Sequence, residues 1–69
     1  MNKIEIGETA RTRRENLGLK QEDLAEMSGL TLKTIHLAES GKGNPSLKTL
    51  EKIATILGME LVLQIKLNK

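Results

Sequence analysis

Glycine divides this sequence into segments that are long enough for short helices and little else. Gly18, Gly29, Gly41 and Gly58 each follow a run of helical composition, and a glycine just after the last turn is a common helix end. Gly29 is expected in the left-handed conformation, which glycine adopts at low cost. The spacing predicts four helices, over about residues 7–17, 21–28, 31–40 and 46–57.

The predicted helices can bury only a small core. A single core in a domain of 69 residues supplies about 3–5 kcal/mol, and domains of this size usually need further support. Disulfides and zinc–thiolate sites are excluded because there is no cysteine, and one histidine is too few for a nitrogen-rich metal cluster. No metal or cofactor is expected, and by elimination oligomerisation supplies the support.

The two ends of the chain have a different pattern from the middle. Residues 1–6 alternate, with Ile4 and Ile6 on one side, which indicates a short strand or a loose tail. After Gly58 the apolar period changes to two over residues 59–67, which predicts a half-buried strand. The expected division is therefore a tail or strand over 1–6, a helical domain over 7–58 and a strand over 59–69.

A lone terminal strand leaves its backbone N–H and C=O groups unpaired. Its partner is either residues 2–6 or the same strand of another chain, and the second is favoured because it also supplies the missing stability. The homodimer seam is then expected at Leu61, Val62, Leu63, Gln64 and Ile65.

Composition narrows the classes of partner. Proteins that bind single strands without sequence preference stack bases on aromatic rings, and this chain contains no Phe, Tyr or Trp. Any nucleic-acid role should therefore concern double-stranded DNA. No apolar run approaches the roughly 18 residues of a membrane span, and the first residues lack a signal-peptide core. We expect a cytoplasmic protein without a membrane partner.

The predicted helix over 31–40 carries an unusual outer face. On a helical wheel Lys33, His36, Leu37 and Ser40 share the outer half, and Thr34 lies at its edge. An apolar side chain beside a lysine suits the major groove, where it can cover a thymine methyl while the lysine reaches guanine. A scattered surface leucine is the alternative. Catalysis by His36 is not supported, because no second histidine, cysteine or tyrosine could partner it.

A longer series of residues follows an order that is typical of one family: Arg14, 17–25 (LGLKQEDLA), 28–31 (SGLT), Thr34, Ile35, 39–42 (ESGK), 44–47 (NPSL) and 50–58. With these residues, the stretch from Ile6 to Leu57 resembles the Xre or phage-repressor family of helix-turn-helix proteins, which includes Cro and lambda repressor. The resemblance implies a mainly α, lambda-repressor-like domain of four to five helices whose second and third helices read duplex DNA.

The resemblance also implies roles for individual residues. Gln21 matches a glutamine that touches the DNA backbone and nearby base edges, and Arg14 and Glu39 match an internal salt bridge. The residues at or beside base-reading and phosphate-contacting positions are Lys20, Gln21, Thr31, Leu32, Lys33, Thr34, His36, Leu37, Lys42, Gly43, Asn44 and Ser46.

The sequence from Thr55 to Gly58, followed by an alternating strand, is similar to HipB-like antitoxins. That narrower resemblance implies C-terminal β-strands that pair across a dimer, an inverted-repeat operator, and a HipA-like kinase toxin as a second partner. A stand-alone phage or chromosomal repressor remains open, as does a protein-interaction module that has lost DNA binding. Nothing in the residue inventory supports an enzyme.

Overall fold

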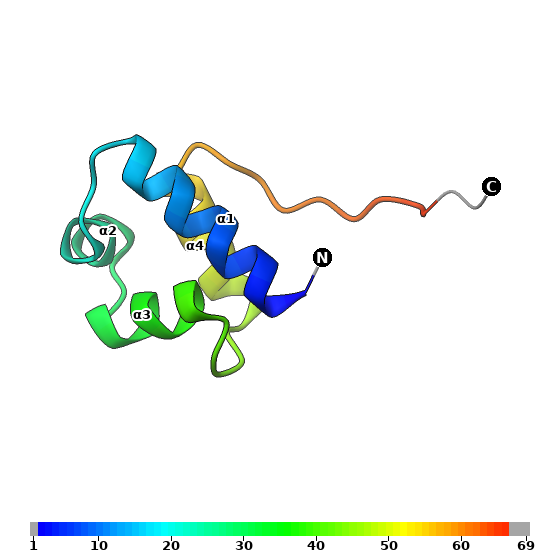
Figure 1. The fold of residues 1–69 in the computed structure, drawn as a ribbon, viewed down its shortest axis with the longest axis horizontal. Coiled ribbons are helices and arrows are strands. Elements are labelled where there is room, and N and C mark those ends of the chain that lie inside the picture. Colours follow the sequence, from blue (N-terminus) through cyan, green and yellow to red (C-terminus); the bar gives the residue numbers. More distant parts are fainter. Residues whose placement is uncertain (1, 67–69) are drawn as a thin grey trace.

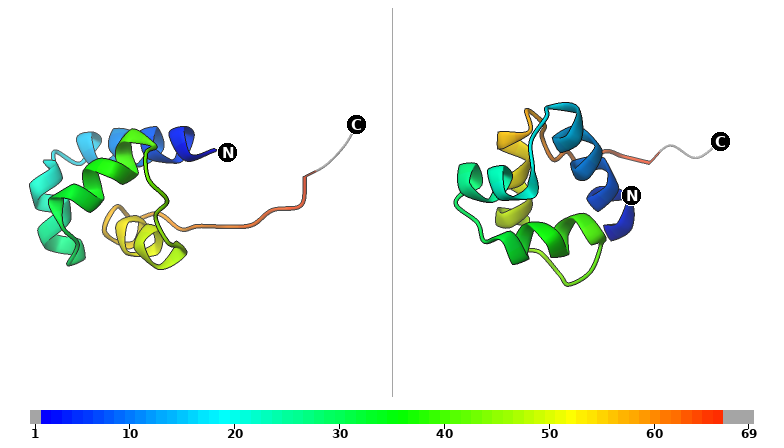
Figure 2. Two further views of the ribbon diagram at one scale, coloured as in Figure 1. Left: turned by 90° about the horizontal axis from the view of Figure 1, so that it is seen from below. Right: turned by 60° about the vertical axis from the view of Figure 1, so that its left-hand side comes forward.

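Four helices make up the folded part of the chain (Figure 1). The computed structural model describes residues 2–66, in which α1 spans Lys3–Asn16, α2 Gln21–Ser28, α3 Leu32–Ser40 and α4 Leu47–Ile56. The helices cross at steep angles around a shared centre, and the chain leaves α4 as an extended tail (Figures 1 and 2). Within residues 2–66, no helix combines the length and apolar character that a membrane crossing requires.

Helix α1 begins earlier than predicted. The tail or strand expected over residues 1–6 is wrong for residues 3–6, which form the first turn of α1. The side chain of Asn2 accepts a hydrogen bond from the Glu5 backbone N–H, and the Glu5 carboxylate accepts one from the Asn2 backbone N–H. This capping box satisfies two N–H groups that a helix start otherwise leaves unpaired. It outweighs the alternation of Ile4 and Ile6 on which the prediction rested.

The other helix ends agree with the predicted ends to within one or two residues. Thr31 and Ser46 each accept a hydrogen bond from the backbone N–H three residues later, which makes them the N-caps of α3 and α4. Gly29 follows α2 with φ +71°, in the left-handed region. Lys20 gives α2 no side-chain cap, but the Asp23 carboxylate accepts its backbone N–H at 2.7 Å.

The hydrophobic core is small and comes mainly from α2, α3 and α4. Its buried members are Leu24, Ala25, Ile35, Ala38, Ile53 and Leu57. Leu17, the last residue of the predicted first helix, is 43 % exposed because α1 ends at Asn16 and Leu17 is its C-cap. Several hydrophobic side chains thus remain on the surface, and a core this small gives limited stability.

Helix α1 and the end of α3 approach each other so closely that one position must be glycine. A Cβ built on Gly7 would lie 2.5 Å from the backbone oxygen of Glu39 and 2.6 Å from that of Ala38. Gly7 is buried in the middle of a helical turn, where glycine costs about 1 kcal/mol relative to alanine. Here the missing side chain is what allows the two backbones to touch. This contact fixes how α3 sits on α1.

The tail beyond α4 forms no strand within residues 57–66, so the predicted C-terminal strand is absent from the described part of a single chain. Residues 67–69, which complete the predicted segment, lie outside the described residues. The helix that now occupies residues 3–6 also removes one of the two strand partners considered. A strand needs a neighbour for its backbone groups, and among residues 2–66 the segment 61–66 has none.

Candidate nucleic-acid interface

The outward face of α3 is set by the residues that α3 buries. Ile35, Ala38 and Glu39 are buried in the domain, so the helical period turns the intervening positions outward. Lys33 and His36 are exposed, and Leu32 is 48 % exposed. The Thr31 hydroxyl is engaged by the Thr34 backbone N–H and hydroxyl, so that it holds the first turn of α3 in place.

The loop from Gly41 to Ser46 forms a shallow groove with α3. The groove has a volume of about 270 Å³ and brings together residues of both elements that were predicted as DNA contacts: Thr34, Leu37, Lys42, Asn44 and Ser46. Leu37, predicted on the outer face, is partly buried, because the loop covers part of it. A Cβ built on Gly43 would lie 3.8 Å from the Leu37 side chain. Leu37 therefore supports the loop as well as facing the groove.

Lys3 adds a positive charge to the same loop, although the sequence does not predict it as a site residue. Its ammonium group donates a hydrogen bond of 2.9 Å to the backbone oxygen of Gly43, across 40 positions of sequence. A nearby contact joins the same two regions, since a Cβ on Gly41 would lie 2.8 Å from the Ile4 backbone. No local pattern predicts this approach, because it depends on how α1 packs on the end of α3.

At the start of α2, Gln21 is joined to the interior of the domain. Its side-chain amide nitrogen donates to a carboxylate oxygen of Glu39 at 3.1 Å. Because the carboxylate can only accept, this contact fixes which end of the Gln21 amide faces inward. The amide oxygen and the second N–H remain available for other partners. Lys20, directly before it, is exposed.

Glu39 in turn pairs with Arg14, as the expected internal salt bridge requires. The Arg14 Nε and a terminal guanidinium nitrogen donate to the two Glu39 oxygens at 2.6 and 3.0 Å, and Arg14 also donates to the Leu19 backbone oxygen at 2.6 Å. Both side chains are buried. The hydrogen bond to Glu39 raises the pKa of Arg14, against the opposing effect of burial. The charges of Arg14 and Glu39 thus neutralise each other beneath the start of α2.

Comparison with known proteins identifies this arrangement. The helix-turn-helix family HTH_3 matches residues 11–64. The chain is 48 % identical over 50 residues to an uncharacterised HTH-type transcriptional regulator of Methanothermobacter thermautotrophicus, an alignment that covers 72 % of each protein. The chain belongs to the HTH_3 helix-turn-helix family. It is thus a DNA-binding transcriptional regulator of the HTH type, in a family of regulators rather than enzymes.

Two solved structures share the fold of this HTH_3 domain. The restriction-modification controller protein C.AhdI from Aeromonas hydrophila is similar with a TM-score of 0.78 and 38 % identity, over 83 % of this chain and 86 % of that one. Apo-HppE is similar with a TM-score of 0.75 and 30 % identity, but the match spans only 34 % of its chain. The four-helix, lambda-repressor-like fold is therefore confirmed. None of these relatives bears the name of an antitoxin.

The residues expected at a dimer seam lie away from α2 and α3 of the HTH_3 domain. Leu61, Val62, Leu63, Gln64 and Ile65 follow one another in the tail, which leaves the helices on the side away from the α2–α3 unit (Figures 1 and 2). All five are exposed. The molecule thus carries two separate surfaces, one polar and basic around α3 and one apolar along the tail.

Proposed function

We propose that this HTH_3 protein is a sequence-specific repressor that binds duplex DNA as a dimer, with α3 in the major groove. One observation carries the proposal. Lys33 and His36 are both exposed on the face of α3 that lies beside the groove between α3 and the loop. Lysine can reach the O6 and N7 acceptors of guanine, and the exposed side of Leu32 can cover a thymine methyl. Such a protein acts where the DNA is, in the cytoplasm of a prokaryotic cell.

The loop and the starts of two helices would hold the DNA backbone around α3. Ser46 caps α4, so the free N–H groups of its first turn form a site that favours phosphate. Lys42 and Asn44 line the groove beside it, and Gly43 lies between them. Lys20 and Gln21 stand at the corresponding start of α2. Contacts of this kind position the protein on the duplex, whereas α3 reads the sequence.

Dimerisation would determine the symmetry and the half-site spacing of the operator. Two copies related by a two-fold axis would place their α3 helices in successive major grooves, about 34–36 Å apart, on an inverted repeat. The exposed apolar tail of residues 61–65 supports a self-associating protein, because contiguous apolar surface commonly marks an interaction site. Pairing of two tails would give each strand the partner that a single chain lacks.

The proposal is tested by selecting bound sequences from random duplexes and then measuring two variants against the selected site. Lys33→Ala should weaken the best site by about 1–3 kcal/mol and leave non-specific binding intact. Lys42→Ala should weaken all duplexes alike and lower the salt dependence by about one phosphate contact. An equal loss on every sequence for Lys33→Ala would remove that residue from base reading, and selection without any preferred sequence would refute the proposal.

An antitoxin role is a narrower form of the same function. In that role the dimer would also bind a HipA-like kinase toxin. The alternating apolar tail is the feature that supports the antitoxin role. C.AhdI, by its name, controls a restriction-modification system, and a controller of that kind is the other narrower form. Co-purification of the protein with a kinase encoded beside it would favour the antitoxin, and a flanking restriction gene would favour the controller.

A further inference from the structure

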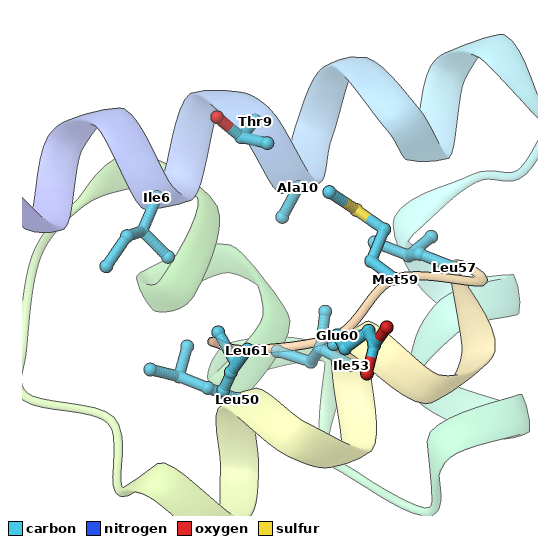
Figure 3. Close-up of a pocket in the computed structure, with 10 residues that line it drawn as sticks. Ile6, Thr9, Ala10, Leu50, Ile53, Leu57, Met59, Glu60 and Leu61 are labelled. Carbon is cyan, nitrogen blue, oxygen red and sulfur yellow. The ribbon is translucent and has the colours of Figure 1, made fainter. Parts of the chain in front are cut away.

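An apolar groove lies between α1 and α4, on a part of the domain that the DNA-binding proposal does not use. Ile6, Thr9 and Ala10 form its α1 wall, and Leu50 and Ile53 form its α4 wall (Figure 3). The groove has a volume of about 220 Å³ and is open on one side. Apart from Thr9 and Glu60, all the side chains around it are hydrophobic. Open apolar space of this kind is suited to hydrophobic side chains from another segment.

The start of the tail already occupies one edge of this groove. Leu61 packs beside Leu50 at its mouth (Figure 3). In an extended chain alternate side chains lie on the same side, so Leu63 and Ile65 continue the side that Leu61 turns toward the groove. Their side chains are 102 % and 90 % exposed. The tail therefore carries two large apolar groups in line with a groove that they do not enter.

The tail of the same chain cannot readily return to this groove. To do so it would have to reverse direction within residues 62–66, whose sequence VLQIK contains no Gly, Pro, Asn, Asp or Ser. Those residues supply the backbone conformations of tight turns, whereas Val and Ile favour extended backbone. In the structure these residues continue away from the helices (Figure 1). The occupant must then come from elsewhere, and a second copy brings a matching tail.

We propose that Leu63 and Ile65 of each tail fill the α1–α4 groove of a second copy of this chain. The exchange is reciprocal, so it closes a two-fold dimer in which both grooves and both tails are covered. It leaves the tail backbones free to pair with each other, since backbone groups lie along the edges of a strand and side chains on its faces. The inference rests on the proposed dimer and adds where each tail is bound.

Two pairs of matched variants test the packing. Leu63→Gln removes an apolar side chain from the groove side, whereas Lys66→Gln introduces the same residue on the opposite side of the tail, outside the seam residues 61–65. Thr9→Glu places a charge in the α1 wall, whereas Thr12→Glu places it at an exposed site of the same helix. Leu63→Gln and Thr9→Glu should each weaken the dimer at least about tenfold in sedimentation equilibrium, and each control should change it less than about threefold. Circular dichroism checks that every variant is folded.

Cross-linking identifies the occupant, because the chain has no cysteine of its own. One population carries Thr9→Cys and a second, with a size tag, carries Ile65→Cys; the two are mixed and oxidised. A disulfide between tagged and untagged chains is the expected product. A stable dimer without it, in which Leu63→Gln and Lys66→Gln behave alike, would overturn the groove exchange while leaving the dimeric repressor standing. A monomer that still binds selected DNA would overturn both the exchange and the dimer, but not DNA reading by α3.

Discussion

Helix α1 packs against α3 on one side and stands away from α4 on the other. The α1–α3 contact has no free space, since Gly7 touches the α3 backbone and Arg14 pairs with Glu39 below the surface. The α1–α4 contact leaves an open apolar groove, and a hydrogen bond of 2.9 Å from Arg13 to the Leu57 backbone oxygen joins the helices near one end of it. The α1–α3 contact is complete within a single chain, whereas the α1–α4 contact leaves apolar space open.

The difference shows how a domain of 69 residues can use one side of a helix for internal packing and leave the other side open for a partner. The complete contact holds α3, which the proposed function requires to be rigid, because base reading depends on correctly placed side chains. The incomplete contact lies on the side of the tail, where a second copy would add the stability that the small core lacks. Four substitutions along α1 and its partners would break or sharpen this contrast.

The largest effect is expected from Glu39→Ala, which leaves the buried Arg14 without its partner. Removing one member of a buried pair costs about 3–5 kcal/mol, which is close to the whole stability expected of a domain this small. The variant should be largely unfolded in a urea titration followed by circular dichroism. The double variant Arg14→Met with Glu39→Leu removes both charges and should recover most of the stability. A stable Glu39→Ala protein would show that the α1–α3 contact does not depend on the pair.

The second-largest loss of stability is expected from Gly7→Ala. Alanine favours helix by about 1 kcal/mol over glycine, but its methyl group would meet the Glu39 backbone oxygen at 2.5 Å. Overpacking of this kind costs about 1–3 kcal/mol, so the variant should be less stable in the same titration. Thr12→Ala, at an exposed position of α1, is the control and should stay within about 0.5 kcal/mol of the parent. A more stable Gly7→Ala protein would mean that the two helices can move apart.

Arg13→Ala tests the polar connection between α1 and α4. Arg13 donates to the backbone oxygen of Leu57, the C-cap of α4, and a single hydrogen bond of this type contributes about 1 kcal/mol. Arg11→Ala is the control, because Arg11 is an exposed arginine on the same helix. Equal unfolding midpoints for the two variants would indicate that hydrophobic contacts alone hold α4 to α1.

The smallest change in stability is expected from Ala10→Leu, which is also the only one of the four substitutions expected to stabilise the folded monomer. Ala10 points into the groove (Figure 3), so a larger side chain can enter open space rather than a packed contact. Filling such space commonly adds about 0.5–1 kcal/mol. The same substitution should weaken the dimer if the tail of a second copy occupies the groove, which sedimentation would reveal. Destabilisation of the monomer would show that the groove is already filled by its own neighbours.

Much of the fold could be predicted from local signals. Thr31 and Ser46 as N-caps, and Gly29 after α2, act on residues within one helical turn, so reading the sequence alone places α2, α3 and α4. The start of α1 also has a local signal in the spacing of Asn2 and Glu5, which competes with the alternation of Ile4 and Ile6. A period of two is a weak signal over so few residues, and two hydrogen bonds of a cap outweigh it.

What the sequence could not predict depends on contacts between distant segments. No local sequence pattern predicts that the backbone of α3 packs against Gly7. None predicts that the Lys3 side chain reaches the backbone oxygen of Gly43. The tail is the opposite case, because its alternation predicts a strand that one chain cannot complete. Sequence periodicity reports the environment in which a segment is stable, and that environment can include a second molecule.

The carboxylate of Glu39 has a consequence for anyone who maps the DNA-binding surface by alanine scanning. Glu39 is 4 % exposed and lies beneath the proposed DNA-binding surface, yet it anchors Gln21 as well as Arg14. A screen that scores only lost DNA binding would therefore group Glu39 with the residues proposed to read bases. Scoring each substitution for protein abundance alongside DNA binding would identify Glu39 as structural, and Lys33 is expected to keep its place among the proposed contacts.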